Sequence, residues 1–171
     1  MNIMTRTNIY LPMTVLLLAA LAMPAAAQTQ VPFKGALQGT DQDGTLNFPI
    51  LPVTTTGTGT GTHLGEFSFK EETGVNVTAG TATGSIHWVA ANGDSIDTTF
   101  TASGGLADAP PVCPGLGETF LRIREFHTII GGTGRFAGAQ GLFIVDRQAS
   151  SVTFKTCGSF DGTITLPRAA H

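Results

Sequence analysis

The sequence predicts an all-β fold, a barrel or sandwich of antiparallel strands. No window of residues 28–171 repeats its apolar positions with the 3.6-residue period of a helix. Instead, seven to nine strand-like runs are separated by short turns rich in Gly, Asn, Asp and Ser. The chain also has 22 glycines, many inside these runs, and strongly curved strands use glycine. These observations favour a barrel, and the successive hairpins predict an up-and-down strand order.

The chain begins with a predicted secretory signal peptide at residues 1–27. Arg6 precedes an apolar stretch that contains Val-Leu-Leu-Leu-Ala-Ala, and three alanines before Gln28 provide small residues for cleavage. The apolar stretch is shorter than the roughly 20 residues that a membrane anchor needs. We therefore expect an exported protein, periplasmic or extracellular and without a membrane anchor. Its single domain would span residues 28–171.

Composition argues against several partners. Without Arg6, 8 basic and 12 acidic residues remain, a formal charge of −4. There is no basic patch, which argues against binding to nucleic acid or to an anionic membrane surface. Charged residues make up only 12% of the chain, about half the usual share. An apolar ligand or a protein partner suits this composition better than a charged substrate.

Several strands can be placed by pattern. Asn92-Gly93 predicts a tight hairpin, because both residues tolerate positive φ. Thr-Gly alternation over residues 54–61 suits either a flexible linker or a strand with one bare glycine face. We favour the strand, and expect it to run on through His63. Two prolines make the run before it irregular. The expected strands cover residues 31–41, 45–53, 54–70, 81–91, 95–103, 118–130, 142–148 and 152–166.

Residues 131–141 contain five glycines between two apolar runs. This pattern predicts strand, glycine corner, strand. A phosphate-binding loop is excluded, because the glycine spacing does not fit G-x-G-x-x-G, no Lys-Ser/Thr follows, and no helical pattern comes next. The structural glycines are Gly131, Gly132, Gly134, Gly138 and Gly141.

The two cysteines, Cys113 and Cys157, predict a disulfide in an exported chain. The bridge would tether the long, proline-containing loop at residues 104–117 to the last strand. The wide spacing makes a redox pair or metal site a weak alternative.

The candidate functional residues lie on the strand before the glycine corner. Glu125 and His127 share one face with Leu121, Ile123 and Ile129 by the two-residue period of a strand. If this face lines a cavity, a carboxylate beside an imidazole could do acid–base chemistry or orient a polar ligand group. The alternative is a hydrogen-bonded structural pair near the barrel mouth.

Two aromatic residues, Trp88 and Phe67, are further candidates for ligand binding. His63 and His87 are also present, but no H-x-H, H-x-x-x-H or C-x-x-C spacing indicates a metal site. Nor is there a G-x-S-x-G sequence for a hydrolase. Glu71-Glu72 is interpreted as a solvated strand end.

The corner Gly-Gly-Thr-Gly-Arg-Phe-Ala-Gly-Ala-Gln-Gly resembles that of the allene oxide cyclase-like barrels, which include plant dirigent proteins and secreted bacterial proteins of unknown role. Three further segments are similar to the bacterial members, namely Gly-Thr-His-Leu-Gly at residues 61–65, Ala-Asn-Gly-Asp at 91–94 and Gly-Ser-Phe-Asp-Gly-Thr-Ile at 158–164. The resemblance covers about residues 62–164.

The resemblance implies a single eight-stranded antiparallel, calycin-like barrel with a central cavity, often in trimers and without a cofactor. The plant cyclases convert an unstable fatty-acid epoxide into a cyclopentenone, and dirigent proteins guide the coupling of phenol radicals. No motif here carries over the catalytic residues of either. We therefore expect a non-catalytic exported barrel that binds a small apolar or phenolic molecule or serves as a structural or assembly module. The alternative is a cofactor-independent isomerase or cyclase that uses Glu125 and His127.

Overall fold

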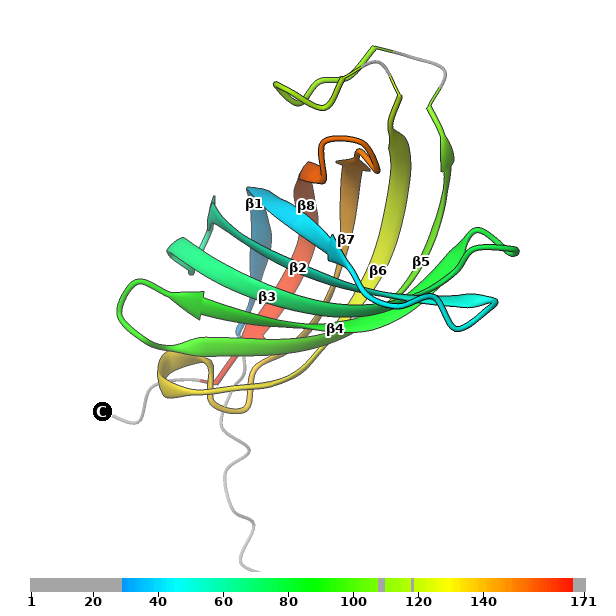
Figure 1. Cartoon of the computed structure of the whole chain (residues 1–171). Helices are drawn as coiled ribbons and strands as arrows, with labels where there is room; N and C mark the ends of the chain where they lie inside the picture. The colour runs from blue at the N-terminus through cyan, green and yellow to red at the C-terminus, as the bar shows by residue number, and fades with distance from the viewer. Residues whose placement is uncertain (1–28, 108–109, 118, 168–171) are drawn as a thin grey trace, which may run out of the picture.

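Eight antiparallel strands close into one barrel in the computed structural model, paired in chain order with β8 returning to β1 (Figure 1). This confirms the predicted fold class. The structure describes residues 29–107, 110–117 and 119–167. The predicted signal peptide at residues 1–27 lies outside them. The strands are β1 (Thr29–Asp43), β2 (Ile50–Gly61), β3 (Gly65–Asn76), β4 (Thr81–Ala90), β5 (Ser95–Leu106), β6 (Leu121–Gly132), β7 (Gln140–Ala149) and β8 (Lys155–Leu166).

Alternation along each strand decides which side chains enter the barrel. On β6, Glu125, His127 and Ile129 are buried, whereas the residue before each of them, Arg124, Phe126 and Thr128, is exposed. On β5, Ile96, Thr98, Phe100 and Ala102 are buried in the same way. The face predicted to carry Glu125 and His127 therefore points into the barrel.

The Thr-Gly run is a strand, as predicted, but it does not continue through His63. Residues 62–64 form a turn, with His63 at φ 63° and Gly65 at φ 67°, and β2 folds back on β3 with Gly61 paired to Gly65. The expected strand at 45–53 is also partly wrong, because residues 44–49 connect β1 to β2, which begins at Ile50.

One end of the barrel is closed by side chains from its turns. Leu64 from the β2–β3 turn, and Phe136 and Ala139 from the corner between β6 and β7, are buried there. The corner holds a short 3-10 helix (η1, Gly134–Phe136), and Gly134 and Gly138 have positive φ. Arg135 ties this corner to the neighbouring turns, since it lies 3.5 Å from Asp94 and donates to the carbonyl of Leu64. The predicted glycine corner is thus confirmed, and its buried side chains help to close this end of the barrel.

Aromatic rings fill the adjoining half of the barrel. Trp88 contacts several phenylalanine rings, with centroids 5.2 Å apart for Phe67 and 5.6 Å for Phe160. The glycines of β2 make room for these rings, because a Cβ at Gly57 or Gly59 would collide with the ring of Phe69 or Phe67. The rings are Phe33, Phe67, Phe69, Trp88, Phe143 and Phe160.

The long connection between β5 and β6 lies at the opposite end and is held by the predicted disulfide. Cys113 and Cys157 are bonded, with their Cα atoms 6.0 Å apart. Cys113, Leu116 and Phe120 form a small second core over the outside of the wall. The backbone N–H of Val112 also donates to Gln148 Oε1 on β7 at 2.9 Å. A disulfide of this kind indicates a protein outside the reducing cytoplasm.

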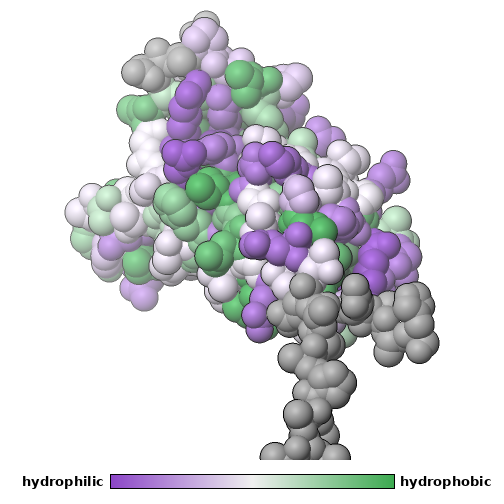
Figure 2. Space-filling model, turned by 180° about the vertical axis from the view of Figure 1, so that it is seen from behind, coloured by the Kyte–Doolittle hydropathy of each residue, from purple (hydrophilic) through white to green (hydrophobic). Residues whose placement is uncertain are grey.

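Hydrophilic and hydrophobic residues are mixed over the outer wall (Figure 2). On the outside of the barrel wall, the exposed large apolar side chains include Phe126 and Ile130 on β6 and Leu142 on β7. Among the described residues, no helix has the length and apolar character needed to span a bilayer.

Candidate functional site: a cavity with a buried ion cluster

The half of the barrel opposite the closed end contains a cavity of about 480 Å³. Its mouth lies among the connections β1–β2, β3–β4, β5–β6 and β7–β8, which all lie at this end. Apolar side chains make most of its walls, and a few polar groups converge at its inner part. The apolar lining includes Leu51, Val53, Val75, Phe100, Ala102 and Ile123.

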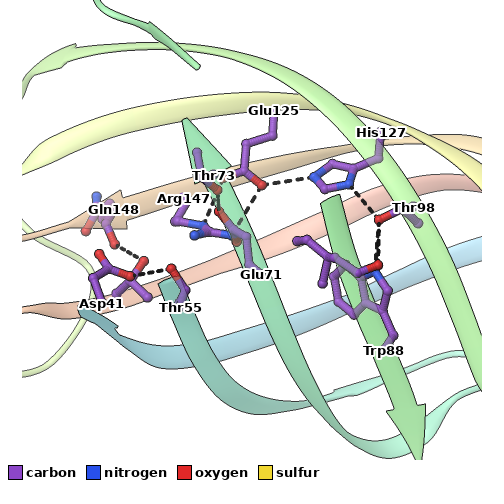
Figure 3. A network of polar contacts seen from close by, with 12 residues as sticks. Asp41, Thr55, Glu71, Thr73, Trp88, Thr98, Glu125, His127, Arg147 and Gln148 are labelled. Carbon is purple, nitrogen blue, oxygen red and sulfur yellow. Dashed lines mark hydrogen bonds and ion pairs between the residues drawn. The ribbon is translucent and has the colours of Figure 1, made fainter. Parts of the chain in front are cut away.

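Arg147 is the centre of the polar part (Figure 3). It lies on the inward face of β7, and its side chain is only 3% exposed. Its Nη2 donates to Glu71 Oε2 on β3 and, at 3.3 Å, to Glu125 Oε2 on β6. Its Nε lies 3.0 Å from Glu125 Oε1 without making a hydrogen bond. Strand alternation alone places these three side chains inside, but barrel closure brings them together.

Glu125 also connects the cluster to the aromatic half. His127 Nε2 lies 2.9 Å from Glu125 Oε2, and its Nδ1 lies 3.3 Å from the hydroxyl of Thr98. Trp88 Nε1 donates to the same hydroxyl at 3.1 Å. The imidazole stacks between Phe100 and Phe143, with ring centroids 4.8 and 4.6 Å away. His127 therefore lies behind Glu125, outside the cavity lining.

A second polar row crosses β1, β2 and β3. Asp41 is paired with Thr55, and Thr55 with Glu71, in the strand register. Thr55 donates to Asp41 Oδ1 at 2.8 Å, and Thr73 donates to Glu71 Oε1 at 2.6 Å. The row places two carboxyl groups on the cavity wall, on either side of a buried threonine.

Burial shifts the protonation of these groups. Burial raises the pKa of Glu71 despite the opposing effect of Arg147, and it raises the pKa of Asp41. Burial would lower the pKa of Arg147, but Glu125 and Glu71 raise it well above its usual value, so the guanidinium stays charged. Burial lowers the pKa of His127, although Glu125 acts in the other direction. At neutral pH the imidazole is therefore uncharged.

A neutral His127 fixes the direction of its hydrogen bonds. Nε2–H donates to the carboxylate of Glu125, which leaves Nδ1 to accept from Thr98, while Thr98 accepts from Trp88. The arrangement holds Glu125 in place at the cavity wall. It can orient a polar group of a bound molecule, or pass a proton between Glu125 and the imidazole.

The structure brings together only part of the set predicted from sequence. Glu125 and His127 form the expected pair, and their roles in binding or catalysis stay predictions. Trp88 and Phe67 lie in the aromatic packing and do not line this cavity. His63 lies in an exposed turn, outside the cavity.

Sequence reasoning missed Glu71, Arg147 and Asp41. The interpretation of Glu71 as part of a solvated strand end was wrong, because its side chain points inward and pairs with Arg147 while Glu72 faces solvent. The available signal was the two-residue period, which puts Glu71 on the face of Phe67 and Phe69.

Within residues 29–107, 110–117 and 119–167, no group of three or more His, Cys, Asp or Glu side chains is arranged to hold a metal ion. Searches among protein-family models, curated proteins and solved structures found no match to this chain.

Proposed function

We propose that this protein is an exported, non-catalytic barrel that binds one small, mainly apolar or aromatic molecule in its open half. The observation that carries the proposal is the cavity of about 480 Å³, which has mainly apolar walls and converging polar groups. Ligand sites in proteins have this size and this mixture of apolar lining and few polar groups.

Two further observations support the proposal. Most of the aromatic core rings pack towards the closed end, and of the rings in this core only Phe100 lines the cavity of the open half among the described residues. A buried ion cluster costs desolvation, and replacing such clusters by apolar residues is often neutral or stabilising. Its presence on the wall of a cavity is therefore better explained by a bound polar group than by stability.

The resemblance to allene oxide cyclase-like and dirigent-like barrels agrees with a cavity protein, and the predicted signal peptide and the disulfide agree with export. A structural or assembly module is the competing non-catalytic role. Exposed Phe126, Ile130 and Leu142 favour homo-oligomers, with trimers expected from the resemblance. Light scattering of the purified protein would test this expectation, and a monomer would contradict it.

The direct test combines native ligand recovery with a cavity-filling variant. Mass spectrometry of protein purified from its native host should detect a co-purifying small molecule. The neutral fluorescent probe N-phenyl-1-naphthylamine should bind to the unloaded protein. Ala102→Phe, which fills the cavity wall, should abolish probe binding, whereas Thr101→Phe on the outer face of the same strand should not.

Circular dichroism must show that both variants remain folded. Probe binding that survives in Ala102→Phe would place the probe elsewhere. Recovery of no molecule together with no probe binding would refute the proposed function and leave the structural role.

A cofactor-independent isomerase is a second candidate, because Glu125 lines the cavity and is hydrogen-bonded to His127, whose imidazole can accept a proton and return it. A fatty-acid epoxide would be incubated with the protein and the cyclopentenone products separated by chiral chromatography. Catalysis predicts an excess of one enantiomer that Glu125→Gln removes without abolishing binding. A racemic product with the wild-type protein would exclude this activity.

A further inference from the structure

The cavity lining is strongly acidic. Among the described residues, its ionisable side chains are four carboxyl groups and one guanidinium, namely Asp41, Asp43, Glu71, Glu125 and Arg147. His127, the imidazole behind Glu125, is neutral and outside the lining. One cation therefore faces four acidic groups in a space with mainly apolar walls.

Arg147 satisfies only the inner two carboxyl groups. It contacts Glu71 and Glu125, but among the described residues Asp41 receives a side-chain hydrogen bond from Thr55 alone. Arg147 is engaged by these two groups, since its Nη2 donates to both and its Nε lies 3.0 Å from Glu125 Oε1. The described cavity lining thus holds more acidic groups than its one guanidinium can neutralise.

The carboxyl groups that Arg147 leaves without a cation also lie where an entering molecule would meet them. Asp41 and Glu71 lie on either side of Thr55 across β1, β2 and β3, and Asp43 follows Asp41 towards the mouth. A molecule that enters with its apolar body along Val53, Val75 and Phe100 would bring its head group against this row.

We propose that the bound molecule has an apolar body and a positively charged amine head, which pairs with Asp41 and Glu71 beside Arg147. The inference rests on the ligand-binding function proposed above and specifies the class of ligand. An amine cation supplies charge that the cavity lacks, and its N–H groups donate to carboxylate oxygens. A carboxylate head would face like charges, which disfavours binding. A neutral hydroxyl would donate one hydrogen bond but would leave the charge uncompensated.

Three probes with the same naphthalene body test the head group. Binding of 2-naphthylmethylamine, 2-naphthol and 2-naphthoic acid would be measured by isothermal titration calorimetry at pH 7.5. We expect the amine to bind at least about tenfold more tightly than the other two, which corresponds to about 1.4 kcal/mol. Equal or tighter binding of naphthol or naphthoate would overturn the amine assignment while leaving the ligand-binding function intact. Binding of none of them, together with failure of the neutral probe above, would remove the function itself.

A matched pair of variants tests the residue assignment. Asp41→Asn should weaken binding of the amine about tenfold and change naphthol by less than about twofold, because only the cation depends on the carboxylate charge. Asp161→Asn serves as the control, since Asp161 is an exposed carboxylate paired with Lys34 on the outer wall. An unchanged preference for the amine in Asp41→Asn would refute the role of Asp41.

Discussion

Replacing Arg147 by methionine tests whether the buried ion cluster is as strongly coupled as its geometry indicates. The change removes the guanidinium but keeps much of its apolar volume. It leaves Glu71 and Glu125 facing each other without a cation, in side chains that are no more than 4% exposed. Solvent cannot screen these two carboxylates. The free energy of unfolding should therefore fall by about 3–5 kcal/mol at pH 7, as it does when a buried ion pair loses one partner.

The assay is urea unfolding followed by fluorescence of Trp88, the single tryptophan, which is fully buried near the cluster. With a slope of about 2 kcal/mol/M, the expected loss lowers the unfolding midpoint by about 1.5–2.5 M. Arg124→Met is the matched control, because Arg124 pairs with Asp146 on the exposed face of the neighbouring strand. We expect the control to change stability by no more than about 0.5 kcal/mol.

The pH dependence has a definite sign. The pKa of Glu71 is already raised by burial, and it rises further when Arg147 is absent. The folded variant therefore holds its proton more tightly than the unfolded chain, and its stability falls as pH rises through that raised pKa. The free energy of unfolding that Arg147→Met loses relative to wild type should therefore be smaller at pH 5 than at pH 8.

A compensating variant separates charge from packing. Glu71→Gln and Glu125→Gln, added to Arg147→Met, should recover most of the lost stability, since no unpaired carboxylate remains. If Arg147→Met unfolded at the same urea concentration as Arg124→Met, or if its deficit did not change with pH, the cluster would not be coupled as described.

Three other measurements follow from the structure. Because burial lowers the pKa of His127, the unfolded chain takes up a proton below about pH 6.5 that the folded chain does not. The difference in free energy of unfolding between wild type and His127→Gln therefore has its full value above that pH. It should shrink as pH falls towards 5, by up to about 1.4 kcal/mol per pH unit, and a constant difference would contradict the assignment. Gly59→Ala should cost about 1–3 kcal/mol in urea unfolding because its Cβ would strike a phenyl ring, whereas Gly105→Ala, with open space around it, should be nearly neutral. Reduction of the Cys113–Cys157 bridge, which spans 44 residues, should cost roughly 4 kcal/mol and lower the melting temperature while the β signal in circular dichroism persists; an unchanged melting temperature would argue against the bridge.

Local pattern was enough to predict much of this barrel. The two-residue period put Glu125 and His127 on the inward face of β6, and Asn92-Gly93 marked a hairpin whose Gly93 has φ 89°. The turn at residues 62–64 escaped prediction because a non-glycine residue, His63, takes the positive φ that usually marks such a turn.

The ion cluster of Glu71, Glu125 and Arg147 could not be predicted from the sequence for a different reason. Arg147 and Glu71 are 76 residues apart, and they meet only because the barrel closes with a particular register. The pattern of one strand reveals that a side chain points inward, but it does not reveal which strand lies across the lumen. The predicted pair Glu125–His127 was found because both residues are on one strand.

The closed end has a consequence for how molecules would be exchanged. Among the described residues, Leu64, Phe136 and the aromatic rings behind them close one end of the barrel, so the cavity opens at the end where the β5–β6 connection lies. A resident molecule must then leave before another can take its place. The rate of displacement would be set by departure alone, and it should not increase with the concentration of the competitor.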